Sequence, residues 1–389
     1  MTTTESRSQT HLDEDAMLDE LRFGLRNYWY PILLSTDLGD DKPVGITRLG
    51  EELALWRDGD GTVHTFADRC AHRGVKLSAG DVVGGRLACR YHGLQYDGTG
   101  QCRFAPIEGE EDGPQAKRLC VTSYPTEEHA GIIWAYIGDL DVFPAPPFEL
   151  DAEVADPNFV WIVKETTWEA NWLLVHDNTS DPVHLPFLHG NYAARVTDDG
   201  IRFDPIGGGE HNPVVTEEVS IDTVRDDLEA IPTENGVLVT RKGADDDHSE
   251  TFDEVEFSLP CDGRVWVPVP VEGVPPVRSI QYELPVDDAS TVVYVYMGVQ
   301  VPDDQREMAQ GVLEEFVWPN FRQVFMEDSW ISSLQGDLRQ NREGENLLSS
   351  DVGPARVRRL IYDAYRRQAA ERAAAGNGEV GVDPPSAAG

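Results

Sequence analysis

Short apolar runs alternate with glycine and aspartate turns in the first half of the chain. The runs cover residues 44–49, 53–56, 62–66 and 132–137. Asp-Gly pairs, which are typical of hairpin turns, stand at residues 58–59, 60–61 and 97–98. This pattern predicts a small antiparallel β domain over about residues 44–138.

The second half of the chain combines strand-like runs with helical segments. A proline-rich boundary at residues 143–148 comes first. Strand-like runs follow at residues 160–167, 237–240, 265–269, 279–284 and 291–299. Good helix formers with few breakers occupy residues 168–175, 304–341 and 354–374. We therefore expect an α+β domain with a large antiparallel sheet.

The ends of the chain differ in character from these two domains. Residues 1–17 are polar and acidic, and residues 375–389 are rich in Ala, Gly and Pro, so both predict disorder. A short helix is expected within residues 18–30. The predicted organisation is therefore a first domain over 18–148 and a second over 149–374.

Composition excludes several classes of partner. The 389 residues carry 70 Asp and Glu against 32 Lys and Arg, a net charge of −38, which repels nucleic acid and anionic membranes. Such a charge fits an ordinary acidic protein or one from a salt-adapted host. No apolar run reaches membrane-spanning length, and residues 1–20 lack signal-peptide features, so we expect a cytoplasmic protein. Five cysteines, an odd number, argue against a disulfide framework.

Two short motifs in the first domain suggest a metal centre. Residues 70–74 read Cys-Ala-His-Arg-Gly, and residues 89–93 read Cys-Arg-Tyr-His-Gly. Each motif supplies one thiol, one imidazole and a glycine that allows a tight turn. The candidate ligands are Cys70, His72, Cys89 and His92.

The order of these ligands separates two kinds of site. A structural zinc site usually keeps its two cysteines together and its two histidines together. Here each loop provides one of each, which is what a Rieske [2Fe–2S] cluster requires, because one iron binds both thiolates and the other binds both imidazoles. The pattern favours the cluster over zinc.

A second motif begins the other domain. Asp181, His184 and His189 follow one another in a segment interrupted by Pro186. On an unbroken helix the two histidines would point in different directions, whereas a proline break can bring them together. Two histidines and a carboxylate form the facial triad of non-haem Fe(II) enzymes. Asp181 before Pro182 is also a good helix N-cap, so the segment alone leaves a purely structural role open.

The carboxylate that completes such a triad has to come from elsewhere in the chain. The acidic pair Glu327 and Asp328 is the candidate. We choose Asp328 as the ligand and keep Glu327 as the alternative. A solvated acidic pair on a helix is the structural alternative in so acidic a chain.

Together these motifs resemble the α subunits of Rieske non-haem iron ring-hydroxylating oxygenases. Residues 26–31 are similar to the entry segment of the carbazole and oxoquinoline types, and residues 177–189 to the motif found across the family, including O-demethylases. The resemblance implies a Rieske β domain followed by a helix-grip catalytic domain. It also implies residue roles: Asp328 as iron carboxylate, Asp181 as electron-bridging carboxylate and Asn178 as iron-pocket amide. The two histidines stand one residue further apart than in the carbazole type, which leaves the subfamily open.

The resemblance implies a multicomponent enzyme. Electrons from NAD(P)H would arrive through a separate ferredoxin or reductase, since the chain lacks a Gly-x-Gly-x-x-Gly element. The implied assembly is a homotrimer in which the cluster of one subunit serves the iron of its neighbour. We expect O₂-dependent hydroxylation of an aromatic or heteroaromatic substrate, most simply dihydroxylation. Monooxygenation or O- or N-demethylation at the same iron is the alternative, and a zinc-binding protein without catalytic activity is a remote one.

Overall fold

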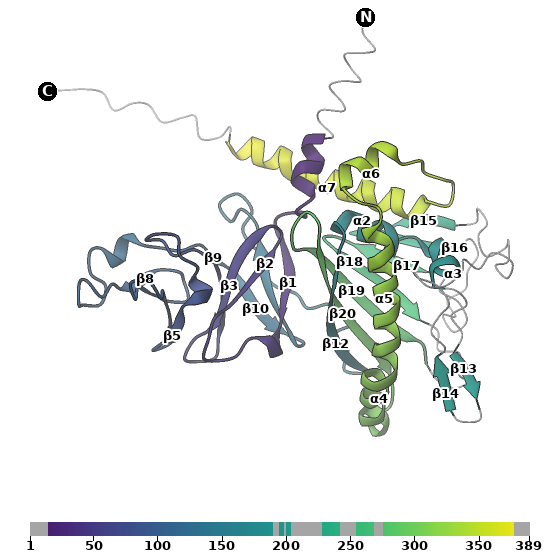
Figure 1. The fold of residues 1–389 in the computed structure, drawn as a ribbon, viewed down its shortest axis with the longest axis horizontal. Helices are drawn as coiled ribbons and strands as arrows, with labels where there is room; N and C mark the ends of the chain where they lie inside the picture. The colour runs from purple at the N-terminus through teal and green to yellow at the C-terminus, as the bar shows by residue number, and fades with distance from the viewer. Residues whose placement is uncertain are drawn as a thin grey trace, which may run out of the picture.

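The computed structural model describes residues 15–189, 194–197, 200–203, 228–241, 254–267 and 275–376. Figure 1 shows small sheets on one side of the molecule and a large sheet covered by helices on the other. All strand pairs in the described residues are antiparallel. The expected α+β class, with a β domain preceding a mixed domain, is confirmed.

The first domain is built from three small sheets, ordered β2-β3-β4-β9, β5-β6-β7-β8 and β1-β11-β10. Their bounds are β1 (Tyr28–Leu34), β2 (Val44–Arg48), β3 (Glu51–Arg57), β4 (Val63–Ala67), β5 (Asp81–Val83), β6 (Arg86–Ala88), β7 (Gln95–Tyr96), β8 (Cys102–Phe104), β9 (Ser123–Tyr124), β10 (Thr126–His129) and β11 (Ile132–Ile137). The first two sheets enclose a core that includes Trp56, Phe66 and Tyr96. The four apolar runs expected here correspond to β2, β3, β4 and β11.

The N-terminal helix begins earlier than expected. Residues 15–21 are helical, because Met17, Leu18 and Leu21 are buried in a core cluster. The helix ends within the predicted range, since Gly24 adopts a left-handed φ of 92° and β1 begins soon afterwards. The prediction of disorder is wrong for residues 15–17 and 375–376, which are helical, and residues 1–14 and 377–389 lie outside the described part of the chain.

The second domain is organised around a seven-stranded sheet ordered β12-β20-β19-β18-β17-β16-β15. Its strands are β12 (Phe159–Trp168), β15 (Leu228–Pro232), β16 (Gly236–Arg241), β17 (Val255–Ser258), β18 (Asp262–Val267), β19 (Val277–Pro285) and β20 (Thr291–Gln300), and a separate hairpin joins β13 (Ala194–Thr197) to β14 (Gly200–Phe203). The interior strands β20 and β19, next to the edge strand β12, are buried almost throughout.

Helices cover one face of this sheet (Figure 1). They are α2 (Trp172–Thr179), α3 (Leu185–Leu188), α4 (Arg306–Val312), α5 (Trp318–Ser333), α6 (Leu338–Gly344) and α7 (Val352–Gly376). The helix expected at residues 168–175 begins later, because Trp168 ends β12 and the Asn171 side chain caps α2 by accepting the Leu173 N–H at 3.1 Å. The long helical region is broken at Gly336, whose φ is 72°.

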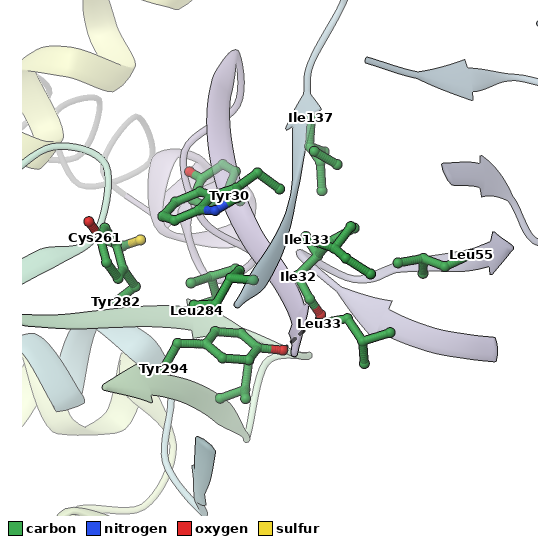
Figure 2. Packing of buried hydrophobic residues seen from close by; sticks show 14 of the residues in the cluster. Tyr30, Ile32, Leu33, Leu55, Ile133, Ile137, Cys261, Tyr282, Leu284 and Tyr294 are labelled. Carbon is green, nitrogen blue, oxygen red and sulfur yellow. Dashed lines mark hydrogen bonds between the residues drawn. The ribbon is translucent and has the colours of Figure 1, made fainter. Parts of the chain in front are cut away.

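The other face of the sheet packs against the first domain. Side chains of β1 and β11 meet side chains of β19 and β20 in one buried cluster, and Figure 2 shows Ile32 and Ile133 close to Leu284 and Tyr294. The Tyr294 hydroxyl donates to the Ile32 carbonyl at 2.7 Å. This shared core joins the two domains into one body and leaves the helix-covered face for the second site.

Two general expectations have a structural counterpart. In the part of the chain that the structure describes, no helix is long and apolar enough to cross a membrane. All five cysteines are free, as their odd number suggested.

Candidate metal centres

The two Cys/His loops of the first domain have the same backbone geometry. The Cys70 N–H donates to the Val75 carbonyl and the Gly74 N–H to the Cys70 carbonyl, both at 2.9 Å. The second loop repeats this closure, with Cys89 bonded to Leu94 and Gly93 back to Cys89. Gly74 and Gly93 have φ values of 69° and 68°, which only glycine adopts without strain. The matched glycines explain why both motifs end in this residue.

These loops bring together all four residues predicted for the cluster. Cys70 and Cys89 are buried, whereas His72 and His92 are exposed and their ring centroids lie 4.8 Å apart. Burial raises the pKa of the Cys89 thiol, and the neighbouring Cys70 adds to this effect. Two thiols inside and two imidazoles at the surface suit a binuclear cluster with a different ligand pair on each iron. They fit a single tetrahedral zinc ion less well.

The Tyr96 hydroxyl lies 3.2 Å from the Cys70 sulfur in this buried environment. Burial, followed by the nearby Cys70, raises the pKa of Tyr96 well above its ordinary value. The tyrosine therefore stays protonated and can donate to a thiolate. The Cys/His spacing carried no signal of this contact, because Tyr96 stands on β7 outside both motifs.

The second site forms where α2 ends. Asp181 begins a short turn that contains Pro182, and its Oδ1 accepts the Val183 N–H at 2.8 Å. The chain then passes through His184 into α3, and His189 ends that helix. The rings of His184 and His189 lie 5.3 Å apart between centroids. The expected helix break at Pro186 is not found, because Pro186 stands in the first turn of α3, where a proline is tolerated, and the two histidines flank this one short helix.

Asp328, from the middle of α5, faces both rings. Its Oδ1 lies 3.3 Å from His184 Nε2 and 3.1 Å from His189 Nε2. The three candidate ligand atoms lie within 4.8 Å of one another. His189 Nε2 and Asp328 Oδ1 are buried without a hydrogen-bond partner among the described residues, because they are not aligned as donor and acceptor. Atoms that converge without bonding one another suit a shared cation.

The opposite edge of each imidazole is held by a different group. His184 Nδ1 contacts the Asp181 carbonyl, and His189 Nδ1 lies 2.9 Å from Glu327 Oε2. The other Glu327 oxygen accepts from Gln323 at 3.2 Å. Partners of this kind fix which ring nitrogen carries the proton and direct the Nε2 lone pairs toward one point. Glu327 thus contacts the outer edge of one ring, whereas Asp328 faces both.

The charges at this site compensate one another. Burial lowers the pKa of His189, but the carboxylates of Asp328 and Glu327 outweigh it and raise this pKa to about 9. Burial likewise opposes ionisation of Asp328, yet His189 and His184 hold its pKa far below the ordinary value. A cation that binds here therefore replaces a proton, as is usual for metal sites with histidine ligands.

Two cavities meet at this site and share Asn178, Asp181 and His184 in their linings. The outer cavity encloses about 600 Å³ and the inner one about 80 Å³. Asn178 is buried, and its Oδ1 has no hydrogen-bond partner among the described residues. Burial raises the pKa of Asp181, and the His184 charge partly offsets this rise.

A network of charged residues that the sequence did not reveal supports the same region. Arg358 of α7 donates to Asp177 at 2.6 Å and to Glu345 at 2.6 Å, and Arg342 also donates to Asp177 at 2.6 Å. Asp177 precedes Asn178, so this network ties the end of α2 to α6 and α7. Its members are far apart in the sequence and share no motif.

Comparison with protein families gives two matches that correspond to the two halves of the fold. Residues 28–125 match the model of the Rieske [2Fe-2S] domain. Residues 168–367 match the model of the vanillate O-demethylase oxygenase C-terminal domain. The first match contains both Cys/His loops, and the second contains His184, His189 and Asp328.

Individual proteins are also similar to this chain in sequence. Protein TIC 55 of Arabidopsis thaliana is 31% identical over 46% of this chain and 33% of its own length. The 5,5'-dehydrodivanillate O-demethylase oxygenase subunit of Sphingobium is 24% identical over 86% of this chain and 74% of its own. The chain thus covers about a third of the length of the Arabidopsis relative.

Solved structures extend the likeness to almost the whole fold. Dicamba monooxygenase bound to 3,6-dichlorosalicylic acid is 26% identical with a TM-score of 0.65, covering 89% of this chain and 98% of that one. The fluorene-bound oxygenase in a ferredoxin complex of carbazole 1,9a-dioxygenase shares the fold, with a TM-score of 0.68, 22% identity and coverages of 89% and 92%.

Fold, motifs and comparisons define a chain in which a Rieske domain is joined to an oxygenase C-terminal domain. The chain belongs to the Rieske non-haem iron oxygenases, and its relatives are their α subunits. The matched Rieske domain is a [2Fe–2S] domain, and dicamba monooxygenase, which shares the fold, has also been solved with non-haem iron.

Proposed function

We propose that this chain is the terminal oxygenase of a multicomponent system that uses O₂ and external electrons to oxidise a small aromatic or heteroaromatic compound. The observation that carries the proposal is the convergence of His184, His189 and Asp328 beside a cavity, in a chain that also bears the paired Cys/His loops. An electron carrier alone has no need of the second site.

The iron ligands in this proposal are His184, His189 and Asp328. Asp328 is preferred over Glu327 because its oxygen lies within 3.3 Å of both Nε2 atoms, whereas the Glu327 oxygens are occupied by His189 Nδ1 and Gln323. A triad of two histidines and one carboxylate leaves positions open for O₂. The cluster ligands are Cys70, His72, Cys89 and His92, supported by their shared loop geometry.

The side chains around the triad have separate tasks. When bound, the iron supplies O₂ chemistry and the cluster supplies single electrons. Glu327 and the Asp181 carbonyl orient the imidazoles through their Nδ1 atoms. Asn178 offers a buried amide oxygen toward the cavities. Phe321, Phe325 and Val265 keep the inner wall apolar and exclude water.

Electron delivery would cross a subunit boundary. Figure 1 places β5 and β8, beside the cluster loops, at one end of the molecule and α3 at the other. We infer a homotrimer in which the exposed histidines of one subunit reach the outer cavity of the next. Asp181 lines that cavity, and its Oδ1 caps the turn while Oδ2 remains for a second donor. The cap and the electron bridge are therefore compatible roles for one carboxylate.

The electron donor is proposed to be a ferredoxin, a reductase or both, supplied ultimately by NAD(P)H. The oxygenase of carbazole 1,9a-dioxygenase, which shares the fold, has been solved in complex with its ferredoxin. We place the protein in the cytoplasm, where cysteines that form no disulfide stay reduced.

Two outcomes at the iron remain in the proposal. Dihydroxylation is the first, and monooxygenation or demethylation is the second. The match to a vanillate O-demethylase C-terminal domain and the similarity to a dehydrodivanillate O-demethylase subunit favour the second.

Product analysis tests this function. The iron-loaded protein is supplied with NADH, a surrogate ferredoxin and its reductase, and a panel of aromatic and methoxy-aromatic compounds under ¹⁸O₂. Substrate-dependent NADH oxidation with ¹⁸O in a hydroxylated product, or formaldehyde from a methoxy compound, supports the proposal. A protein that contains zinc, lacks acid-labile sulfide and gives no product under any of these conditions contradicts it.

A further inference from the structure

The interior strand β19 carries buried polar residues on a face that is otherwise apolar. Ser279, Gln281 and Glu283 alternate along the strand and have relative exposures of 0%, 8% and 0%. Valines of the adjacent strands, with Val277 of β19 itself, form the apolar cluster on this face. Burying polar groups among valines is unfavourable unless they have partners, so each of the three needs an explanation.

Two of these residues have partners within the protein. Glu283 pairs with His176 and accepts from the Thr179 hydroxyl at 3.2 Å. Ser279 accepts from Gln281 Nε2 at 3.3 Å. Two oxygens of this row, Gln281 Oε1 and Glu283 Oε1, are buried with no hydrogen-bond partner among the described residues, and of these two residues only Gln281 lines the inner cavity.

Gln281 lines the inner cavity beside the proposed iron site. Its cross-strand neighbour on β18 is Gly263, which also lines the cavity and contributes no side chain. A methyl group added at Gly263 would find its nearest neighbour, Glu283 Oε1, only at 3.6 Å. The cavity is therefore open next to the unpaired amide oxygen, and a ligand that enters it can donate a hydrogen bond there.

The charges around the inner cavity limit the ligand further. Among the described residues, Arg264 is the only lysine or arginine in the lining. Its register partner is Ile280, which packs in the interdomain core, so the Arg264 side chain lies on the opposite face of the sheet. There it pairs with Asp151, Glu153 and Asp262. Apart from the proposed histidine ligands, no described cationic side chain therefore points into the cavity, where it could pair with the carboxylate group of a bound compound.

We propose that Gln281 determines specificity by accepting a hydrogen bond from a neutral single-ring aromatic substrate that carries a phenolic O–H or an N–H group. This inference rests on the proposed function for the location of the substrate. Apolar walls from Val255, Phe321 and Phe325 contact the ring, and the amide oxygen fixes its orientation. The cavity formed by the described residues, about 80 Å³, is smaller than the roughly 150 Å³ of a cavity that holds benzene, so we restrict the proposal to one ring.

Binding to matched pairs of compounds tests the proposal. The anaerobic, iron-loaded protein is titrated by calorimetry with phenol and anisole, 2-methoxyphenol and 1,2-dimethoxybenzene, pyrrole and N-methylpyrrole, and benzoate. The donor compound of at least one pair is expected to bind about tenfold more tightly than its methylated partner, and benzoate more weakly than phenol.

Variants then assign this preference to one atom. Gln281→Met, which keeps the length of the side chain but removes the acceptor, is expected to reduce the donor preference to about onefold while the affinity for the methylated partner is kept. Gln305→Met makes the same change at an exposed site and should leave the preference intact. Iron content and melting temperature establish that each variant is folded, and the wild-type ratios provide a test that needs no variant.

Any one of four results would overturn the proposal. They are equal binding within every pair, tighter binding of benzoate than of phenol, an unchanged preference in Gln281→Met, and no binding of any donor compound. If the enzyme oxidises a substrate but shows no preference for compounds that donate a hydrogen bond, only the role assigned to Gln281 is contradicted. A failure of the proposed function itself would instead be seen as the absence of iron or of an oxygenated product. The titrations measure neither of these.

Discussion

The two metal sites are constructed in opposite ways. The cluster loops lie close together in the sequence, and each is closed by its own backbone hydrogen bonds and a left-handed glycine. The triad site takes two histidines from the two ends of α3 and a carboxylate from α5, which follows all seven strands of the large sheet. The first geometry is encoded locally, whereas the second exists only once the domain has folded.

This difference predicts different sensitivities. Changes in a cluster loop should remove one cofactor and leave the rest of the chain intact. Changes around the triad should depend on how α2, α5 and α7 are held together, since Asp328 reaches the histidines only through helix packing. The predictions below separate ligand, positioning and scaffold effects, from the largest to the smallest.

Asp328→Ala is expected to have the largest effect. Loss of one of three protein ligands should abolish binding of the mononuclear iron and lower turnover by more than about a thousandfold, while the visible spectrum of the cluster remains. Iron analysis and product formation measure these outcomes.

Glu327→Gln is the matched variant at the neighbouring carboxylate. It removes the charge behind His189 but leaves the triad, so iron affinity should fall by only about 10- to 100-fold. If this variant loses its iron completely while Asp328→Ala keeps it, the ligand assignment is reversed.

Asp181→Asn sharpens the comparison at the boundary between the sites. Asparagine caps helices as well as aspartate does, so the turn should persist while the charge is lost. We expect both metals to be retained and the transfer of electrons from reduced cluster to iron to slow by at least about tenfold. Single-turnover oxidation of the pre-reduced cluster, with substrate and O₂, measures it.

Asp337→Asn provides the control for that experiment, because Asp337 caps α6 in the same way, away from the triad. It should oxidise its cluster at the wild-type rate. A wild-type rate in Asp181→Asn as well would leave Asp181 as a helix cap only.

The packing of the triad site can be weakened without touching a ligand. Arg358→Met removes charge-assisted hydrogen bonds from the partly buried Asp177 and Glu345 and leaves Arg342 as their remaining partner, which should lower the free energy of unfolding by about 2 kcal/mol. Arg366→Ala removes an exposed ion pair with Asp363 and should change it by less than about 0.5 kcal/mol. Urea unfolding compares them, and equal effects would contradict the role of the network.

Lowering the pH should weaken the same network gradually. Burial favours the protonated Glu345, but Arg358 and Arg342 outweigh it and keep its folded-state pKa below the ordinary 4.5. The stabilisation by Glu345 is therefore fully present above about pH 4.5 and is lost as pH falls through the lower folded pKa. The stability difference between wild type and Glu345→Gln should be constant from pH 6 to 8 and shrink in acid. A difference that grows in acid would exclude this linkage.

The sequence predicts the cluster site better than the triad site, because the cluster loops are encoded locally and the triad exists only once the domain has folded. Cys70, His72, Cys89 and His92 could be chosen from spacing alone, since the loops are short and glycine marks their turns. The choice between Asp328 and Glu327 rested on a family resemblance, because adjacent residues on a helix point in different directions and only the packing of α5 decides which one faces His184. The alternation of Ser279, Gln281 and Glu283 was visible as polar residues at every second position in an apolar run. Only the pairing of Gln281 with Gly263 in the folded sheet shows that this row of polar residues borders a cavity.

Metal and sulfide analysis of three proteins tests the central claim, two independent centres in one chain, most directly. Wild type, Cys89→Ser and Asp328→Ala are purified anaerobically after loading with iron and sulfide, and iron, acid-labile sulfide and the EPR signal of the reduced cluster are measured. The account predicts two cluster irons with two sulfides plus one further iron in wild type. It predicts the single iron alone in Cys89→Ser, and the intact cluster without that iron in Asp328→Ala. Loss of both centres in both folded variants, or zinc in place of iron in wild type, would contradict it.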